Sequence, residues 1–450
     1  MRKLFWVVST CALMIISVKS YGEIEGPGLD WKGFVSLRLG QIVQGDKETV
    51  VGKDARSDHV WVQQMNVGLG LSSEFKQVPA TGNLDIEISV NNDDSPSESD
   101  FGISRRLNFY PFIARADIEF RVIERENSTL QIDVGYFPYK YNSSVRNLGE
   151  YLFRSGTYPQ YLVTEVDFPM ARLLGLRVGG TNGGDVFKWD VLATTNVEWS
   201  AIGDLNLSAI ASWKPFPVFE LGVGGSWCSI ISVDLSKTTP EARSTEYLAP
   251  KPGTNDTMVY NYTFAGQKVM ARLLFDLKQL LPWKDKFGEE ELKLYSEAAI
   301  LGLINYPVSI DGYTRYDSLW QRIPVMVGLN IPTNRFLDVL SLEVEWYGNP
   351  YVNSINSIKF DNQPVPLSSH AKEKTKVYQN IHSDDIKWSI HARKVIANNF
   401  FIKAQFASDH IRWYRLDFTK MDGKEAFRNT FQKNGLPDHW YYTFKIGYTF

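Results

Sequence analysis

The sequence predicts an all-β fold: a transmembrane antiparallel up-and-down β-barrel of about 16 strands, within a range of about 14 to 18. Three observations lead to this prediction. Apolar and polar residues alternate along many stretches, short connections alternate with long ones, and no segment shows a helical period that could cover the apolar strand faces. The length of 450 residues suits one barrel domain, because all-β barrels run long as single units.

The alternation is clearest in "WVQQMNVGLGLSSEF", residues 61–75, where Trp61 and Met65 share one face and Gln64 and Gly68 the other. Aromatic residues make up 14% of the chain, and many stand near strand ends, as in the interface girdles of membrane barrels. A soluble β-sandwich would seldom need them there. The predicted strands are 33–43, 61–75, 82–91, 111–123, 129–137, 172–181, 185–197, 204–214, 217–231, 262–278, 290–303, 320–332, 337–348, 384–395, 398–410 and 439–450.

The connections between these segments support an even strand number. Those after even-numbered strands are short and turn-like, such as "TNRF", "VIANN" and the longer "LPWKDKFGEE". Those after odd-numbered strands are long, with residues 198–203 as the exception. Short periplasmic turns that alternate with long outer loops are the pattern of outer-membrane barrels, and an even count places both termini on the periplasmic side.

The N-terminus has the features of a secretory signal. Arg2 and Lys3 precede an apolar stretch from Leu4 to Val18, and a cut after Ser20 or after Gly22 fits signal peptidase. We therefore expect residues 1–20 to be the signal peptide and residues 21–450 a single barrel domain. An uncleaved anchor is the less favoured alternative, because the apolar stretch is shorter than the ~20 residues of a membrane span.

Charge and cysteine content exclude several classes of protein. Removal of the three bases in residues 1–20 would change the net charge from −3 to −6, which is mild and argues against a nucleic-acid partner. Cys11 would leave with the signal, so Cys228 alone remains and can form neither an internal disulfide nor a cysteine-based zinc site. The six histidines show no metal-ligand spacing, and neither a cofactor nor a metal is expected.

The last strand, "WYYTFKIGYTF", carries the most specific local signal. Aromatic or apolar residues alternate to the final position: Tyr442, Phe444, Ile446, Tyr448 and Phe450. This last strand, the signal peptide and the turn–loop alternation together make the chain resemble the outer-membrane porins of Gram-negative bacteria. The resemblance implies that these residues are an address for the barrel-assembly machinery, that the barrel contacts outer-membrane lipids, and that the assembly is a homotrimer.

A barrel of this strand number encloses a lumen too wide for side chains to fill. Only about a dozen residues separate the signal from the first predicted strand, too few for a plug domain, so a water-filled interior is expected. Charged residues at inward positions agree, since Arg or Lys facing lipid at mid-depth would cost about 2–4 kcal/mol. The predicted pore-lining residues are Asp117, Glu119, Asp133, Arg177 and Arg272. Alternatively, such charges pair with one another and select nothing.

The third outer loop, residues 138–171, is too long for a plain connection. Its sequence is compatible with a short helix. Ser143 or Ser144 can cap the helix, Leu148 and Leu152 lie on one face, and Gly156 can end it. In the porins that the chain resembles, the third loop folds inward and narrows the pore. We therefore predict a constriction where the loop charges meet the wall charges, formed by Arg146, Glu150, Arg154, Arg38, Arg115 and Arg121. The alternative is a helix packed over the outer rim.

These features favour a passive diffusion channel for small hydrophilic solutes and ions, without enzyme activity or catalytic residues. Both signs of charge occur among the inward residues, so the sequence does not specify an ion preference. Two other classes stay open: an outer-membrane hydrolase with its site at the outer rim, and a surface-exposed structural or adhesion barrel. The glycine-rich "GTNGGDVF" lies in a predicted two-strand turn without a following helix, and so is not a phosphate loop.

Overall fold

The structure, a computed structural model, describes residues 29–44, 47–50, 53–56, 60–75, 79–92, 107–159, 171–195, 203–231, 245–250, 257–262, 266–303, 318–349, 385–408, 412–414, 430–432 and 439–450. The predicted signal peptide and its cleavage site lie outside these ranges, and that prediction stays untested. Among the described residues, no helix has both the length and the apolar character needed to cross a membrane.

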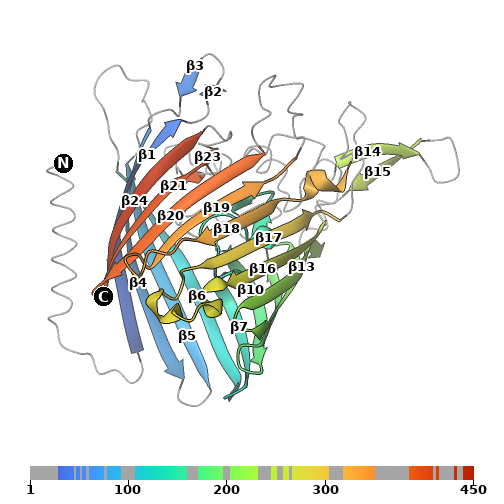
Figure 1. The fold of residues 1–450 in the computed structure, drawn as a ribbon. Helices are drawn as coiled ribbons and strands as arrows, with labels where there is room; N and C mark the ends of the chain where they lie inside the picture. Colours follow the sequence, from blue (N-terminus) through green and yellow to red (C-terminus); the bar gives the residue numbers. More distant parts are fainter. Residues whose placement is uncertain are drawn as a thin grey trace.

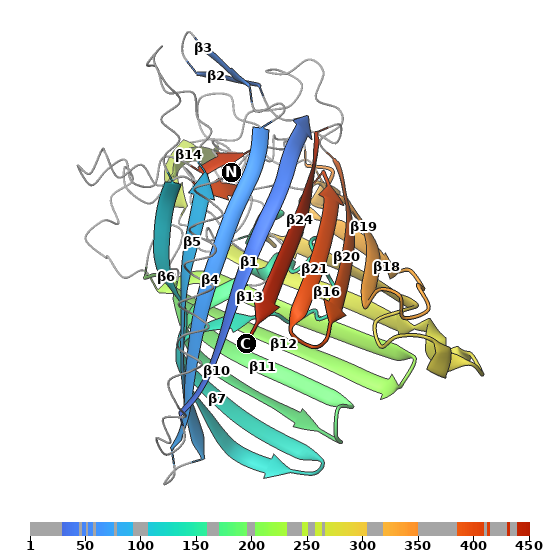
Figure 2. The same ribbon diagram turned by 90° about the vertical axis from the view of Figure 1, so that its left-hand side faces the viewer.

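Sixteen of the described strands form one closed antiparallel barrel, as predicted (Figures 1 and 2). Consecutive barrel strands pair with each other, and the first pairs with the last. The barrel strands are β1 Leu29–Gln44, β4 Val60–Phe75, β5 Ala80–Asn92, β6 Leu107–Arg125, β7 Ser128–Tyr139, β10 Ala171–Asn182, β11 Phe187–Thr195, β12 Leu205–Phe216, β13 Phe219–Ile231, β16 Gly266–Asp276, β17 Lys293–Leu301, β18 Val325–Asn330, β19 Val339–Trp346, β20 Ile386–Ile396, β21 Phe400–Ala407 and β24 Trp440–Thr449.

Each predicted strand corresponds to one of these, although some bounds differ. The largest difference is at predicted strand 320–332, where β18 begins only at Val325 and follows a short 3-10 helix, η5 Leu319–Arg322. Pro324 stands between them and has no N–H to donate to a ladder, which explains the late start.

In the described parts of the connections, four two-stranded sheets lie outside the barrel sheet. They pair β2 Lys47–Val50 with β3 Lys53–Arg56, β8 Arg154–Ser155 with β9 Tyr158–Pro159, β14 Thr245–Pro250 with β15 Thr257–Tyr262, and β22 Arg412–Tyr414 with β23 Thr430–Gln432.

The two faces of the barrel wall differ in chemistry, as the alternation predicts. On β19, Leu342 and Trp346 are exposed on the outer face, whereas Glu343 and Glu345 are buried on the inner face. On β24, Phe444 is exposed on the outer face and Lys445 is buried inside, in the predicted orientation. On these two strands the apolar groups therefore lie outside and the ionisable groups inside.

We call the end of the barrel that carries the short connections the turn rim. The chain terminus is fixed there: the backbones of Gly33 and Phe450 exchange hydrogen bonds of 2.8 and 2.9 Å. The Phe450 ring stacks on Tyr448 and meets the edge of Trp31. A Cβ at Gly33 would meet the far edge of the Phe450 ring, so a larger residue there would require that ring to shift. The terminal residue thus completes the closing seam.

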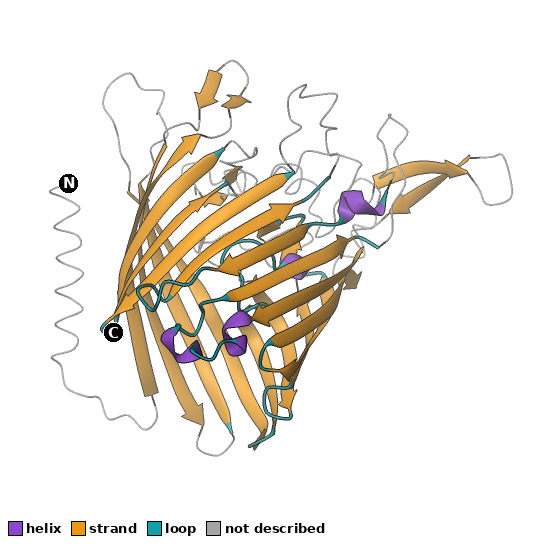
Figure 3. Cartoon of the chain, viewed as in Figure 1, coloured by secondary structure: helices purple, strands orange, loops and turns teal. Residues whose placement is uncertain are grey.

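One part of the turn rim is larger than predicted. The connection between β16 and β17, residues 277–292, contains two 3-10 helices, η3 Leu277–Leu280 and η4 Lys284–Lys286 (Figure 3). It packs on the connection between β18 and β19, residues 331–338. We call these two connections together the rim platform.

The buried Glu291 carboxylate joins the two connections of the rim platform. It accepts hydrogen bonds from the N–H of Gly288 at 2.9 Å, from the N–H and hydroxyl of Thr333 at 2.9 and 2.6 Å, and from the N–H of Arg335 at 2.9 Å. Burial alone would raise the pKa of Glu291, but these hydrogen bonds outweigh burial and lower the pKa to about 2.

Deletion of Phe450 should reduce the amount of folded barrel, because it removes two backbone hydrogen bonds and two ring contacts from the closing seam. The measurement is the fraction of heat-modifiable protein on unheated gels of outer-membrane fractions. Those molecules that do fold should conduct like the wild type. An unchanged folded fraction would contradict a role for this residue in assembly.

Replacement Glu291→Gln should destabilise the protein at neutral pH and matter less in acid. A folded-state pKa of about 2, below the ordinary 4.5, means that the carboxylate contributes stability above about pH 4.5 and loses it as the pH falls toward 2. Thermal unfolding in detergent at several pH values measures this. A melting difference between wild type and variant that stays constant from pH 7 to pH 3 would refute the assignment.

Candidate pore constriction

Residues 140–159, which follow β7, fold into the barrel and are called the inward loop here. The short helix predicted from Ser143 or Ser144 to Gly156 does not form over that length: the segment contains the 3-10 turn η1 Tyr151–Phe153 and the short β8–β9 pair. Gly149 and Glu150 have φ angles of 85° and 59°, which interrupt a right-handed helix. Backbone N–H groups of the loop bond to side chains of the barrel wall or of the loop itself, instead of to carbonyls four residues back.

Glu343 of β19 makes the densest of these contacts. Its carboxylate accepts hydrogen bonds from the N–H groups of Arg146, Asn147 and Leu148, at 2.5, 2.8 and 2.9 Å. The hydroxyl of Tyr295, on β17, donates to the same carboxylate at 2.8 Å. A single fully buried side chain therefore accepts hydrogen bonds from three consecutive backbone N–H groups, which have no helical carbonyl partners.

Glu297 of β17 holds the loop at a second point. It accepts from the Tyr141 hydroxyl at 2.6 Å, the Asn142 side-chain amide at 2.9 Å and the Tyr151 N–H at 3.0 Å. The Tyr151 hydroxyl donates to Glu345 at 2.8 Å. Charge-assisted hydrogen bonds of this kind are stronger than neutral ones, so the acidic wall positions fix the loop firmly.

Lys268 of β16 binds carbonyl groups of the loop backbone. Its buried ammonium donates to the carbonyl oxygens of Tyr151, at 3.3 Å, and of Arg154. Carboxylates thus take the N–H groups of the loop while an ammonium takes its carbonyls, and both stand on the wall formed by β16 to β19.

Apolar packing inside the barrel fixes the loop further. Leu148 and Leu152 are both buried, although not as one face of a helix. They belong to a cluster with side chains from both flanking parts of the wall: Phe137, Leu173, Leu192, Ile210, Met270, Tyr295 and Met326. The loop therefore has its own hydrophobic core within the barrel.

The predicted loop charges are buried and point to partners other than those expected. Arg146 donates to Glu290 of the rim platform at 2.5 Å. Glu150 accepts from the backbone N–H of Asn142 at 2.5 Å, and burial raises its pKa, with the Glu297 charge adding and Lys140 opposing. Arg154 donates to the carbonyls of Asn147 and Thr157.

The predicted wall arginines have separate partners. Arg38 donates to Gln64 on the neighbouring strand at 3.2 Å. Arg115 pairs with Asp117, and Arg121 lies 3.7 Å from carboxylates of Glu74 and Glu119. None of the contacts described above joins the three loop charges to these arginines. The reason is that the loop is drawn to the acidic wall of β17 and β19.

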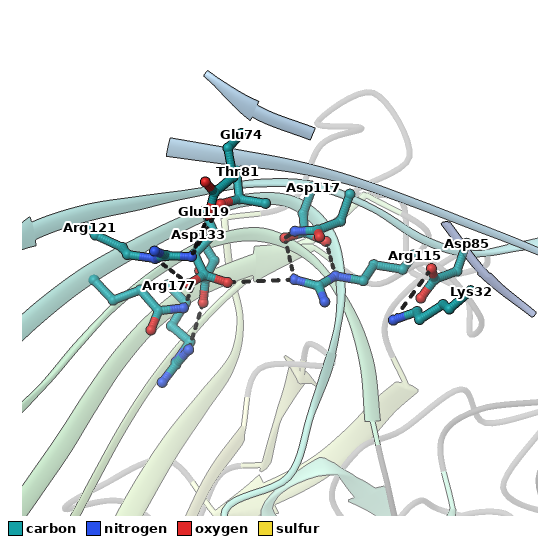
Figure 4. Close-up of polar contacts among 12 residues, drawn as sticks. Lys32, Glu74, Thr81, Asp85, Arg115, Asp117, Glu119, Arg121, Asp133 and Arg177 are labelled. Carbon is teal, nitrogen blue, oxygen red and sulfur yellow. Dashed lines mark hydrogen bonds and ion pairs between the residues drawn. The ribbon is translucent and has the colours of Figure 1, made fainter. Parts of the chain in front are cut away.

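The predicted pore-lining residues on the wall of β4 to β11 belong to a charged ladder, part of which Figure 4 shows. Arg177 bridges Asp133 at 2.6 Å and Asp190 at 2.8 Å. Glu119 lies between Arg115 and Arg121, 3.8 and 3.7 Å from their guanidinium groups. Arg272, on β16, pairs with Glu220 at 2.5 Å. For these residues, the geometry agrees with the alternative in which inward charges pair with one another.

Sequence reasoning missed the residues that hold the loop. Glu343 and Glu345 stood out only as inward charges in the alternating "SLEVEW" of β19, and Lys268 had no recognisable signal. Their partners in the loop lie more than a hundred residues away in the sequence, so no local pattern could reveal the contacts. Among the described residues, no cluster of three or more histidine, cysteine or acidic side chains is placed to hold a metal ion.

No protein-family model and no curated protein matches the sequence. The fold is similar to solved porins and channels. With Pseudomonas putida OprB the TM-score is 0.49 at 12% identity, over 94% of both chains. Salmonella typhi OmpF, in complex with daunomycin, gives 0.43 at 12% identity, over 94% of this chain and 97% of that one. DcaP of Acinetobacter baumannii, an outer-membrane channel, gives 0.40 at 12% identity, over 96% and 99%.

Replacement Glu343→Ala should release the inward loop. The replacement leaves three buried N–H groups without an acceptor. Each of them would cost about 1–3 kcal/mol of stability unless the loop moves. We expect larger and noisier unitary currents in planar bilayers. Glu124→Ala is the matched control, because it removes an exposed carboxylate at the turn end of β6, which has no role in fixing the loop or lining the constriction. Equal currents in Glu343→Ala and wild type would show that the loop does not depend on this carboxylate.

Proposed function

We propose that this chain is an outer-membrane porin, a water-filled channel for passive diffusion of small hydrophilic solutes and ions. The main support for this proposal is a loop that carboxylates of the wall fix inside a closed barrel. Elsewhere in the interior the wall is charged. A soluble barrel would have no reason to expose Leu342, Val344 and Trp346 outside while it places Glu343 and Glu345 inside.

The constriction lies between the inward loop and the charged ladder. Arg146, Glu150 and Arg154 shape it from buried positions by fixing the loop, and do not line it. Arg115, Glu119 and Arg177 keep part of their side chains accessible, and so they set the field that a passing ion meets. Because each of these charges has an opposite neighbour, selection by size should outweigh selection by charge.

The location and partners follow from the same proposal. The protein is exported by its signal peptide, contacts outer-membrane lipids, and is inserted by the barrel-assembly machinery. The assembly signal is the last strand, where the aromatic side chains Tyr442, Phe444 and Tyr448 alternate on the outer face up to Phe450. A homotrimer remains a prediction from the resemblance, as does the absence of enzyme activity.

Purified, heat-modifiable protein in planar bilayers should give stepwise ohmic currents. The steps arise because each inserted barrel adds one permanent aqueous path, which needs neither a ligand nor an energy source. Folded protein that inserts into the bilayer without such steps would contradict the channel.

Replacement Arg177→Ala should shift the channel toward cations. It leaves two carboxylates, Asp133 and Asp190, without the guanidinium that bridges them. Reversal potentials in a salt gradient should report a several-fold rise in the ratio of cation to anion permeability. Arg125→Gln, at the exposed turn between β6 and β7, is the control for loss of one positive charge. Equal shifts in both variants would place Arg177 outside the conducting path.

A further inference from the structure

The rim platform presents large apolar side chains to the surroundings. Phe336 is 78% exposed, Leu280 68% and Trp283 52%. In Figure 2 the connection between β16 and β17, coloured yellow, projects sideways from the barrel. Short turns that only reverse the chain do not need such side chains, so the platform requires an explanation of its own.

These side chains are exposed on a well-ordered scaffold. The buried Glu291 ties the two connections together, as described above. In addition, Lys278 donates to the carbonyl of Gly288 at 3.2 Å, and the Arg335 guanidinium donates to the carbonyls of Asp285 and Phe287. Lys394 of β20 donates to the Arg335 carbonyl at 3.0 Å. So many internal hydrogen bonds hold the apolar groups in place, and their exposure is therefore a property of the fold.

The platform begins directly after β16 and so adjoins the outer face of the barrel at the same rim. Phe275 ends the outer face of β16 just before the platform, and its ring lies 5.2 Å from that of Phe219 on β13. Phe216, in the neighbouring turn, is also exposed. The platform extends this aromatic row sideways, away from the lumen.

The polar groups beside the apolar ones suit a membrane interface. Lys284 and Lys286 lie just after Trp283, one on each side of Asp285, and both are exposed. Tryptophan favours the boundary between acyl chains and headgroups, and lysine can place its stem along apolar surface while its ammonium stays with the phosphates.

We propose that the rim platform is a phospholipid-binding site at the periplasmic boundary of the membrane. Leu280, Trp283 and Phe336 insert among the acyl chains, while Lys284 and Lys286 contact headgroup phosphates. This inference rests on the proposed function to the extent that it requires the barrel to lie in a membrane. A periplasmic protein is the competing occupant, and the position next to the outer face of the barrel favours lipid.

The test uses the full chain with Cys11→Ser, Cys228→Ser and a single new cysteine, Leu280→Cys or Phe336→Cys, labelled with an environment-sensitive fluorophore. Each variant is reconstituted into phosphatidylcholine vesicles with or without bromine on the acyl chains. We expect brominated lipid to remove most of the fluorescence and aqueous iodide to remove little. Asp185→Cys, exposed in the turn between β10 and β11 at the same rim, is the matched control and should show the reverse.

Iodide quenching of Leu280→Cys and Phe336→Cys equal to that of Asp185→Cys, without quenching by bromine, would overturn the proposal. A platform made for a periplasmic protein would give that result in vesicles of purified protein. Unitary conductance of the same samples separates this proposal from the channel itself. Normal current steps with a water-exposed label refute lipid binding alone, whereas quenching by lipid without current steps refutes the channel alone.

Discussion

Every backbone N–H and C=O of a sheet that faces lipid has to find its partner inside the protein, and this constraint governs the whole structure. The ladder between β1 and β24 meets it by joining the ends of the sheet, from Phe34 opposite Thr449 to Gln44 opposite Trp440. Closure removes the free edges and separates an inner from an outer face. The alternation of side chains then decides which residues meet the lumen and which meet the surroundings.

The same constraint explains the carboxylates inside the barrel and at its rim. A segment that leaves the sheet, such as the inward loop or the rim platform, cannot pair its N–H groups with a neighbouring strand. Glu343 and Glu297 supply acceptors to the loop, and Glu291 supplies them to the platform. Each of these carboxylates binds several donors at once, so one acidic residue fixes a stretch of irregular backbone.

Much of the fold followed from the sequence because barrel strands depend on local alternation and on turn residues. Even so, β18 starts later than its apolar pattern suggested, since Pro324 cannot donate a ladder hydrogen bond. The loop was harder to predict. Leu148 and Leu152 have helical spacing, but a helix there would have to compete with Glu343 for the N–H groups of Arg146 to Leu148. The acceptor that wins lies far away in the sequence, so propensity within the loop could not reveal the outcome.

The contacts of the inward loop also determine what kind of channel this barrel can be. The loop is held at the rim platform by Glu290, and on the wall by Glu297 and Glu343, so its position follows the shape of the barrel itself. Moving the loop would expose several buried donors and the hydrophobic cluster together, which makes small independent displacements costly. A loop held in this way defines a lumen of fixed width. Solutes would then be sorted by size at a rigid constriction, while the paired charges of the opposite wall keep that path hydrated.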